Sequence, residues 1–527
     1  MNSGLIKPDG TPLVARQAAR PVARYLRDTK SGVIASRIAP LTRHEEDVRR
    51  SWERAAGLAM DLIQNSGRLK GATDQVLADT VGVGLTLSPQ PDLQPLGWSG
   101  EEETAFIRTV KKRWRRYWNS ASEVSMNGKL TGPQLVDIGL RWHIAYGEAT
   151  GVFDFFDAAT RRRYGVTTGT KLRLVPPHRL VQDTNAPAGL FQGVQHDENG
   201  RVMSYRFRTG PAGLERAEDF PAFDSEGRPL VMHIFDPMDS EDVRGISLLA
   251  PAFRKHIQAE MLDDATLQMA ILQTVFAITL TSEAPSQDAF EALEALREAG
   301  EGGKTIAAEY MGYLGAQLDR AADSRVSVGA DPQVSHLGPG EDLSLKTANV
   351  PGKDFLPFSG SLARDMARTI GITYGGLTMD HTQSTYSSVR MENASIWSVV
   401  MRRRERIAAP MCQMTYEQWL DEEIGEGRIP FKGGYAAFLA QRGSVVGANW
   451  QGPAKPTADD YKSARAATER LGNGTSSIAI ETGDLGTDPD SLFEERQREH
   501  RRYVDAGMAS PYAAREDAPV IQTEPLP

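Results

Sequence analysis

The sequence predicts an α+β fold, and three observations indicate it. Apolar residues recur every three or four positions over 44–80 and 100–150, as on one face of a helix; they include Trp114, Trp118, Leu135, Ile138 and Trp142. Between residues 153 and 233 the pattern changes to the alternation typical of strands. From residue 249 a helical pattern returns and continues to about residue 280.

Composition indicates several domains. The chain has 527 residues and is 40% hydrophobic, enough for each domain to bury a core. The longest apolar run, 269–280, is interrupted by polar residues and is shorter than the roughly 20 residues that span a bilayer, so no membrane segment is expected. The basic N-terminus has no apolar block, which argues against secretion. A single cysteine, Cys412, excludes an intrachain disulfide and fits a reducing cytosol.

The net charge of −9 argues against a general nucleic-acid binder. Such proteins gain affinity from an excess of Lys and Arg that neutralises phosphates. A protein past which DNA must slide without sticking is still compatible with this charge.

The N-terminal third begins with residues 1–40, which are basic and weakly periodic. Either a disordered tail or an arm that clasps a neighbouring subunit fits this composition. The helical region 44–80 follows, and the apolar alternation of 81–87 predicts a short strand before the helical region 100–150.

The strand-rich segment contains a hairpin signal. Residues 171–175 alternate, and the two runs 193–195 and 202–208 flank Asn199-Gly200, a dipeptide that favours two-residue hairpin turns. This segment forms the β half of the predicted α+β domain.

A long helix is predicted to start between Ser247 and Pro251, since Pro is tolerated in a first turn. It should run about 30 residues, or some 45 Å. Residues 283–350 then form a distinct insert with a helix at 286–298 and short strands between prolines and glycines. The insert is too short and polar to fold alone, so we expect it to pair with copies of itself.

Residues 351–421 form a helix, a loop at 373–385 and a long second helix. The loop contains hydroxyl and amide side chains but no Lys or Arg, and it shows no catalytic signature. This combination indicates a mechanical or channel-lining part. Pro410 lacks an N–H and crowds the carbonyl of Arg406, which predicts a kink or break in the long helix there.

The C-terminal region should consist of short helices. Thr457 and Asp459 can cap a helix that Gly472-Asn-Gly474 closes, and a second helix should start at Asp488 and end near Gly507. Residues 510–527 are expected to be disordered.

Motifs for catalysis or cofactor binding are incomplete. Gly302-Gly-Lys-Thr305 resembles the end of a phosphate-binding loop, but Glu298 stands where the first glycine belongs. Gly82-Val-Gly84 lacks the third glycine of a dinucleotide fingerprint, so we interpret it as a strand. The histidines form no zinc motif, and Asp263 and Asp264 point to different faces of a helix. We therefore predict no catalytic residue, no metal and no cofactor.

A basic cluster, Arg402, Arg403, Arg404 and Arg406, follows the loop on the long helix. It could contact DNA phosphates. For an acidic protein we favour a solvated helix face, or an inter-subunit row of salt bridges with acids such as Glu422 and Glu423.

Six segments in order resemble one family. They are Val110-Lys-Lys-Arg-Trp-Arg-Arg-Tyr-Trp118, Leu172-Arg-Leu-Val-Pro-Pro-His-Arg-Leu180, Val231-Met-His-Ile-Phe-Asp-Pro237, Arg244-Gly-Ile-Ser-Leu-Leu-Ala-Pro251, Leu337-Gly-Pro-Gly-Glu-Asp342 and Thr385-Tyr-Ser-Ser-Val-Arg390. From about residue 40 to residue 510 the chain resembles a portal protein of the lambda-type tailed-phage family. The fourth and sixth segments are the most specific, because each opens a long helix in the expected order.

The resemblance implies a cyclic ring, usually a dodecamer, at one vertex of the capsid, without enzyme activity. Double-stranded DNA would be packaged and ejected through it. Implied partners are the terminase large subunit, then the head–tail connector, with the major capsid and scaffold proteins; no membrane is involved. The ring would belong to the virion of a phage or prophage and assemble in the host cytoplasm. Alternatives are another head–tail junction ring such as an adaptor or, with less support, a packaging ATPase subunit.

The resemblance also assigns segments to the parts of a portal fold. These are an N-terminal arm (1–45), a wing (46–245), a stem helix (246–282), a clip (283–350), a second stem helix (351–372), a tunnel loop (373–385), a kinked long helix that returns to the wing (386–450), a crown (451–510) and a disordered tail (511–527). In the tunnel loop the residues expected to face DNA are Thr373, Tyr374, Asp380, His381, Thr382, Gln383, Ser384 and Thr385. Neutral donors of this kind can touch a moving backbone weakly, whereas a ring of arginines would hold it.

Overall fold

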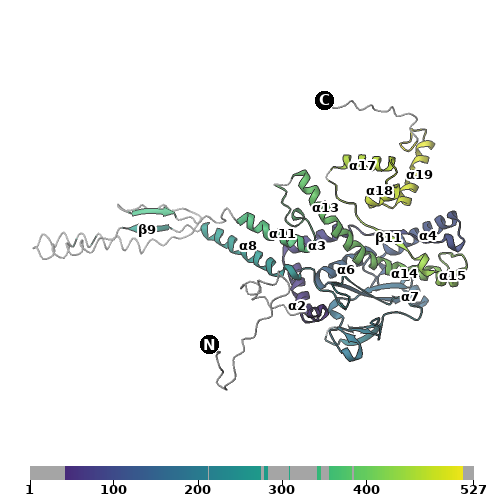
Figure 1. Cartoon of the computed structure of the whole chain (residues 1–527), viewed down its shortest axis with the longest axis horizontal. Coiled ribbons are helices and arrows are strands. Elements are labelled where there is room, and N and C mark those ends of the chain that lie inside the picture. The colour runs from purple at the N-terminus through teal and green to yellow at the C-terminus, as the bar shows by residue number, and fades with distance from the viewer. Residues whose placement is uncertain are drawn as a thin grey trace, which may run out of the picture.

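The computed structural model describes residues 42–211, 213–274, 278–282, 308, 312, 341–345, 355–382, 385–457 and 459–513. It is an α+β protein, as predicted. Figure 1 shows a broad body of helices and sheets, from which two helices, α8 and α11, project side by side, while three C-terminal helices lie above the body. Residues 1–41 of the predicted arm (1–45) and residues 514–527 of the predicted tail (511–527) lie outside the described residues, as do the insert helix at 286–298 and the glycine motif at 302–305.

Two helices, α2 (His44–Asn65) and α3 (Gly67–Thr80), form the predicted helical region 44–80. They are separate because Ser66 takes an extended backbone and its hydroxyl caps α3 by accepting from the Leu69 N–H. Both pack against α6 (Gly132–Tyr146). The predicted helix pattern is therefore confirmed, with a break that the capping residue explains.

The strand predicted at 81–87 is wrong over residues 81–85. Val81–Val83 form a turn in which Gly82 has φ +59°, a left-handed conformation that favours glycine. The strand β1 begins later, at Thr86–Pro89, and pairs antiparallel with β11 (Ala448–Gln451). The Gly82-Val-Gly84 motif is thus a turn and not a strand.

An aromatic cluster joins the helix that follows β1 to a helix about 300 residues later in the chain. Helix α4 (Gly100–Trp118) starts at a capping box of Ser99 and Glu102 and is followed by the single turn α5 (Ala121–Val124). The Trp114 ring stacks on Trp118 at 4.8 Å between centroids and meets the edge of Trp419 at 5.3 Å. Burial of these rings fixes α4 against α14 (Ala409–Gly425).

Two antiparallel sheets follow in the lower body (Figure 1). The first has β2 (Glu148–Phe155) between β3 (Thr170–Leu174) and β8 (Val231–Phe235), with the short helix α7 (Ala158–Tyr164) after β2. The second has the order β4 (Leu190–Phe191), β5 (Val194–His196), β6 (Val202–Thr209) and β7 (Arg216–Pro221). The predicted hairpin is confirmed: β5 and β6 pair across a turn closed by the Gly200 N–H to the Asp197 carbonyl at 3.1 Å.

The segment Arg244–Ser247, which leads into α8, is bound firmly to the body. The Arg244 guanidinium is fully buried and donates to the Glu148 carboxylate at 2.8 Å, while a Cβ on Gly245 would stand only 2.1 Å from the Gly147 carbonyl oxygen. The Ser247 hydroxyl donates to the Ile144 carbonyl at 3.0 Å. These contacts account for Arg, Gly and Ser at positions 244, 245 and 247.

Helix α8 runs from Phe253 to Thr274, after the short turn Ala250–Ala252. The prediction of one helix to about residue 280, within a stem helix of 246–282, is wrong at its end: β9 (Ile278–Ser282) is a strand that pairs antiparallel with β10 (Glu341–Leu345). Ile278, Thr279 and Thr281 are β-branched, which favours a strand. The predicted strands of the insert are consistent with β10.

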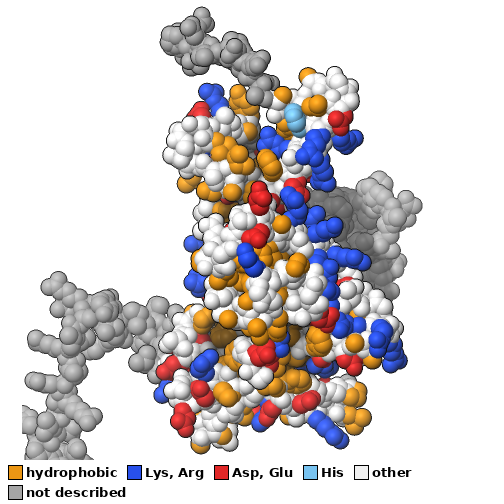
Figure 2. Space-filling view, turned by 90° about the vertical axis from the view of Figure 1, so that its right-hand side faces the viewer, with side chains coloured by type: hydrophobic (Ala, Val, Ile, Leu, Met, Phe, Trp, Pro, Cys, Tyr) orange, Lys and Arg blue, Asp and Glu red, His pale blue; other side chains and the backbone are white. Residues whose placement is uncertain are grey.

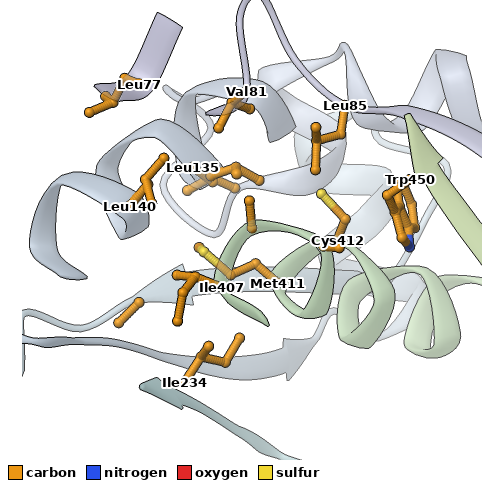
Figure 3. Close-up of a cluster of buried hydrophobic side chains, with 14 of the residues drawn as sticks. Leu77, Val81, Leu85, Leu135, Leu140, Ile234, Ile407, Met411, Cys412 and Trp450 are labelled. Atoms are coloured by element: carbon orange, nitrogen blue, oxygen red, sulfur yellow. The ribbon is translucent and has the colours of Figure 1, made fainter. Parts of the chain in front are cut away.

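The rest of the core forms around the C-terminal half of the body. Helix α11 (Phe355–Ile370) packs along α8, and α13 (Tyr386–Arg403) continues through a π-helical turn, Arg404–Ala408, into α14. Figure 3 shows Ile407, Met411 and Cys412 from this region in one buried cluster with Leu135 and Leu140 of α6. The short helices α15 (Gly434–Ala440) and α16 (Arg442–Val445) lead to β11.

The C-terminal helices are α17 (Asp460–Gly472), α18 (Ile478–Asp484) and α19 (Pro489–Asp505). The predicted caps are confirmed for Asp459, which accepts from the Lys462 N–H at 3.0 Å, and for Asp488, which accepts from the Ser491 N–H at 2.9 Å. Gly474 and Gly507 have the positive φ expected after a helix end. In the part of the chain that the structure describes, no helix is long and apolar enough to cross a membrane.

Candidate functional site

The helix–loop–helix at 355–425 is the candidate site, and its loop is partly helical. The segment expected as a loop at 373–385 begins with a turn of helix, α12 (Tyr374–Thr378), capped by the Thr373 hydroxyl, which accepts from the Gly376 N–H at 2.9 Å. Gly375 and Leu377 are buried, and α12 packs on α3 of the body. Thr373 and Tyr374 are therefore only partly exposed, so an open loop over all of 373–385 is wrong.

The exposed part of the loop is short. Residues 379–382 are all exposed, and Met379 ends α12 with φ +56°. The Asp380 carboxylate accepts from the Thr382 hydroxyl at 2.7 Å and from its N–H at 3.0 Å, which lowers the pKa of Asp380. Asp380, His381, Thr382 and the exposed cap Thr385 are accessible as predicted; Gln383 and Ser384 lie outside the described residues.

One cation near the loop was missed by the sequence prediction. The Arg364 guanidinium of α11 lies 4.8 Å from the centre of the Tyr374 ring, a cation–π contact at the root of the loop. Arg364 is on the exposed face of α11, opposite the buried Ala363, Met366 and Ala367. The helical spacing of these three apolar residues would have placed Arg364 on the outer face, and only the fold brings it to Tyr374.

Behind the loop lies a pocket of about 270 Å³. It opens between α3, α12 and α13, and its lining includes Asp79, Thr373, His381, Glu392 and Trp397. Burial raises the pKa of Asp79, although Gln75 and Arg403 oppose this shift. The described residues contain no group of three or more His, Cys, Asp or Glu side chains that could hold a metal ion, here or elsewhere.

The basic cluster divides into two exposed and two buried arginines. Arg402 and Arg406, one turn apart, both pair with Asp236, each with an N–O distance of 2.9 Å. Arg403 donates to the Ile370 carbonyl at 2.7 Å, and Arg404 donates to the Thr80 carbonyl at 2.9 Å. Each of the four side chains thus has a contact within its own chain.

The expected pairing of this cluster with Glu422 and Glu423 is wrong. The Glu422 carboxylate accepts from the backbone N–H groups of Gly169 and Thr170 and from Arg428, at 2.6 to 2.7 Å. Glu423 binds Arg428 and Arg113. Both acids are buried in the body, where their own partners already satisfy them.

The long helix changes geometry where Pro410 predicts an irregularity. The Ala409 N–H bonds to the Arg404 carbonyl, five residues back, so the segment Arg404–Ala408 is a π-helical turn. Pro410 follows directly, at the start of α14, and has no N–H to bond a carbonyl of the preceding turn; the π-helical turn is the irregularity that accompanies it. The helix is not broken at this point.

The exposed loop is polar and carries no positive charge in the residues that the structure describes. The exposed residues 379–382 and Thr385 carry one carboxylate, one imidazole and two hydroxyls, and the described part of 373–385 contains no Lys or Arg. Among the described residues, no group of three or more His, Cys, Asp or Glu side chains that could hold a metal ion lies near them. Such a surface can touch a polyanion weakly and release it.

Comparison with known proteins identifies the family. Residues 31–404 match the family described as "Phage portal protein, lambda family". The chain is 25% identical over 469 residues to "Portal protein B" of Escherichia phage lambda, which covers 88% of this chain and 86% of that one.

Solved structures are also similar. The neck of an empty GTA particle has a TM-score of 0.38 and 13% identity, over 75% of this chain and 87% of that one. An HK97 family phage portal protein from Corynebacterium diphtheriae has a TM-score of 0.29 and 14% identity, over 69% and 89%. The family match covers most of the chain, including α8, α11 and α13, and we conclude that the chain belongs to the lambda family of phage portal proteins.

Proposed function

We propose that this chain is the subunit of a portal ring through which double-stranded DNA is packaged into a capsid and later ejected. Family membership over residues 31–404 is the observation that carries the proposal. The relative from phage lambda that is named portal protein B matches this chain over 86% of its own length. No enzyme activity is part of the proposed role.

We further propose that the ring is a homododecamer and that the loop residues 379–382 face the DNA. The projecting helices α8 and α11 support this arrangement, because their outer faces expose large apolar side chains: Met261, Leu267, Leu356 and Phe358. A cyclic ring presents two different faces of each subunit to its neighbours and would cover such residues. The terminase large subunit, the head–tail connector, and the capsid and scaffold proteins are the proposed partners.

Electron microscopy of the purified full-length protein tests the assembly. Closed rings with a central hole are the expected particles. A monomer that hydrolyses ATP would contradict the proposal and favour a packaging motor.

A change in loop charge tests the DNA-facing assignment. The double substitution Asp380→Arg and Thr382→Arg places two cations per subunit on the exposed loop, and each contact with a phosphate should add to the affinity for DNA. We expect rings to form as in the native protein while DNA packaging slows severalfold in a packaging assay. Thr104→Arg on the exposed face of α4 is the control and should package at the native rate. Native-rate packaging by the loop variant would contradict the assignment.

A further inference from the structure

Two consecutive arginines at the end of α13 bind the ends of two other helices. Arg403 contacts the end of α11, and Arg404 contacts the end of α3. Successive side chains on a helix point about 100° apart, so neighbouring residues can reach elements on different sides. Both helix ends present carbonyl groups that have no partner within their own helix, and a cation is favourable at such an end.

Arg403 binds at the point where the loop begins. Its Nη2 donates at 2.7 Å to the carbonyl of Ile370, the last residue of α11 and three residues before the cap Thr373. The next residue, Gly371, has φ +80°, and a Cβ there would stand 3.1 Å from Arg403 Nη2 and 2.9 Å from a methyl carbon of Val399. The glycine therefore ends α11 and leaves room for the guanidinium.

Arg404 holds the element on which the loop rests. Its Nε donates to the Thr80 carbonyl at 2.9 Å, and Nη2 donates to the Pro453 carbonyl at 3.1 Å. Thr80 is the last residue of α3, and α12, the first turn of the loop segment, packs on α3. Both supports of the loop, the end of α11 and helix α3, are therefore tied to adjacent residues of one helix.

Stability alone does not account for Arg403. The residue is only 8% exposed, and its Nη1 is buried without a hydrogen-bond partner. The nearby Asp79 carboxylate accepts instead from the Gln75 amide at 2.7 Å. A buried cation without a paired carboxylate is costly, and an apolar side chain of similar volume would fill the space at less cost.

We propose that Arg403 is a positioning residue for the DNA-facing loop: it fixes the place and direction in which the chain leaves α11. Arg404 fixes the end of α3 to the same helix, so the end of α11 and the helix under the loop are both held in place. The inference rests on the proposed role of the loop in the channel, but its test needs no DNA.

A spin label on the loop measures this effect directly. The single native cysteine, Cys412, is fully buried, so a nitroxide on Thr382→Cys would label the exposed loop selectively. In the full-length protein, Arg403→Gln should shorten the rotational correlation time of the label by roughly two-fold, since a glutamine is too short to reach Ile370. Arg403→Lys, which keeps the charge but offers no planar fork, should give an intermediate value. Gly371→Ala, which displaces the guanidinium from the opposite side, should also mobilise the label.

Two controls separate positioning from general stability. Arg402→Gln removes an exposed pair with Asp236 on the same helix and should leave the label unchanged. Val231→Ala lowers the stability in a separate core cluster of the small sheets and should lower the Tm without mobilising the label. A label as immobile in Arg403→Gln as in the native protein, or equally mobile in Val231→Ala, would overturn the inference. Failure to form rings or to pass DNA would instead count against the proposed function.

Discussion

The carboxylate of Glu148 is fully buried and binds two charged or titratable partners at once. Arg244 donates to it at 2.8 Å, and His233 Nε2 lies 3.0 Å from its second oxygen. The Arg244 guanidinium also lies 4.5 Å from the centre of the Trp52 ring. Burial alone would raise the pKa of Glu148, but Arg244 and His233 more than offset it and lower the pKa to about 2.

This pKa makes the stability of the body dependent on pH. The folded-state pKa is depressed, so the contribution of Glu148 is fully present above its unfolded value near 4.5 and is lost as the pH falls toward 2. Glu148→Gln leaves Arg244 buried without a counter-ion, and we expect the free energy of unfolding at pH 7 to fall by about 3–5 kcal/mol. Urea titrations at several pH values measure it: the variant should lose less stability than the native protein between pH 4.5 and 2. An equal loss in both would contradict this role.

Arg402 and Arg406 are the exposed pair of the arginine cluster, and both bind Asp236. Arg406→Gln leaves Asp236 with Arg402, and exposed ion pairs contribute about 0–1 kcal/mol. The free energy of unfolding, measured by urea titration at pH 7, should therefore fall by less than about 1 kcal/mol. Arg404→Gln is the matched comparison: it leaves the carbonyls of Thr80 and Pro453 without their donor and should cost more. Equal effects of the two substitutions would show that burial does not distinguish these arginines.

At the scale of elements, the π-helical turn joins four parts of the molecule. It continues α13, begins α14, and brings Arg404 against the ends of α3 and of the segment that leads to the C-terminal helices. Gly452 permits this approach, because a Cβ there would stand 2.4 Å from the guanidinium carbon of Arg404. The turn and the glycine therefore form one joint, although they lie far apart in the sequence.

Gly452→Ala tests this joint. The added methyl must displace Arg404 from its three carbonyl partners, and overpacking of this kind costs about 1–3 kcal/mol. Thermal denaturation should show a lower Tm. Gly472→Ala, which meets no atom within 4 Å at the end of α17, is the control and should change the Tm little. A native Tm for Gly452→Ala would mean that Arg404 has room to move.

On the scale of the whole molecule, the C-terminal helices have little core of their own. Within the described residues 459–513, no large apolar side chain is buried, whereas Tyr461, Ile478, Ile480, Leu485, Phe493, Val504 and Met508 are exposed. Figure 2 shows hydrophobic side chains on the surface at the top of the molecule, beside Lys and Arg. In the proposed ring these faces would meet the neighbouring subunits, because burying their apolar side chains there is favourable.

Phe493→Ser tests this expectation. Loss of a buried phenylalanine would remove roughly 1.5–3 kcal/mol per subunit from ring stability. We expect native mass spectrometry to show dissociation of the rings at lower denaturant, with unchanged circular dichroism of the separate subunit. Met238→Ser, at a similarly exposed site in the body, should leave the rings intact. Rings of native stability would place Phe493 on a free surface.

How much the sequence predicted depends on how local the determining interactions are. The hairpin at Asn199-Gly200 and the caps at Asp459 and Asp488 follow from a few neighbouring residues, and all three are confirmed. The end of α8 and the helical turn α12 were missed. Leu377 of α12 is held by packing on α3, from a distant part of the chain, and no local pattern reveals that contact.

By itself the sequence determined the α+β class, the order of most elements, the motifs of the portal family and a loop without Lys or Arg, because each depends on local composition and spacing. Only the tertiary structure decided what Arg402, Arg403, Arg404 and Arg406 do. On one helix these side chains point in different directions and meet partners up to 325 residues away along the chain. Four similar residues in the sequence therefore become two surface ion pairs and two buried supports of the loop.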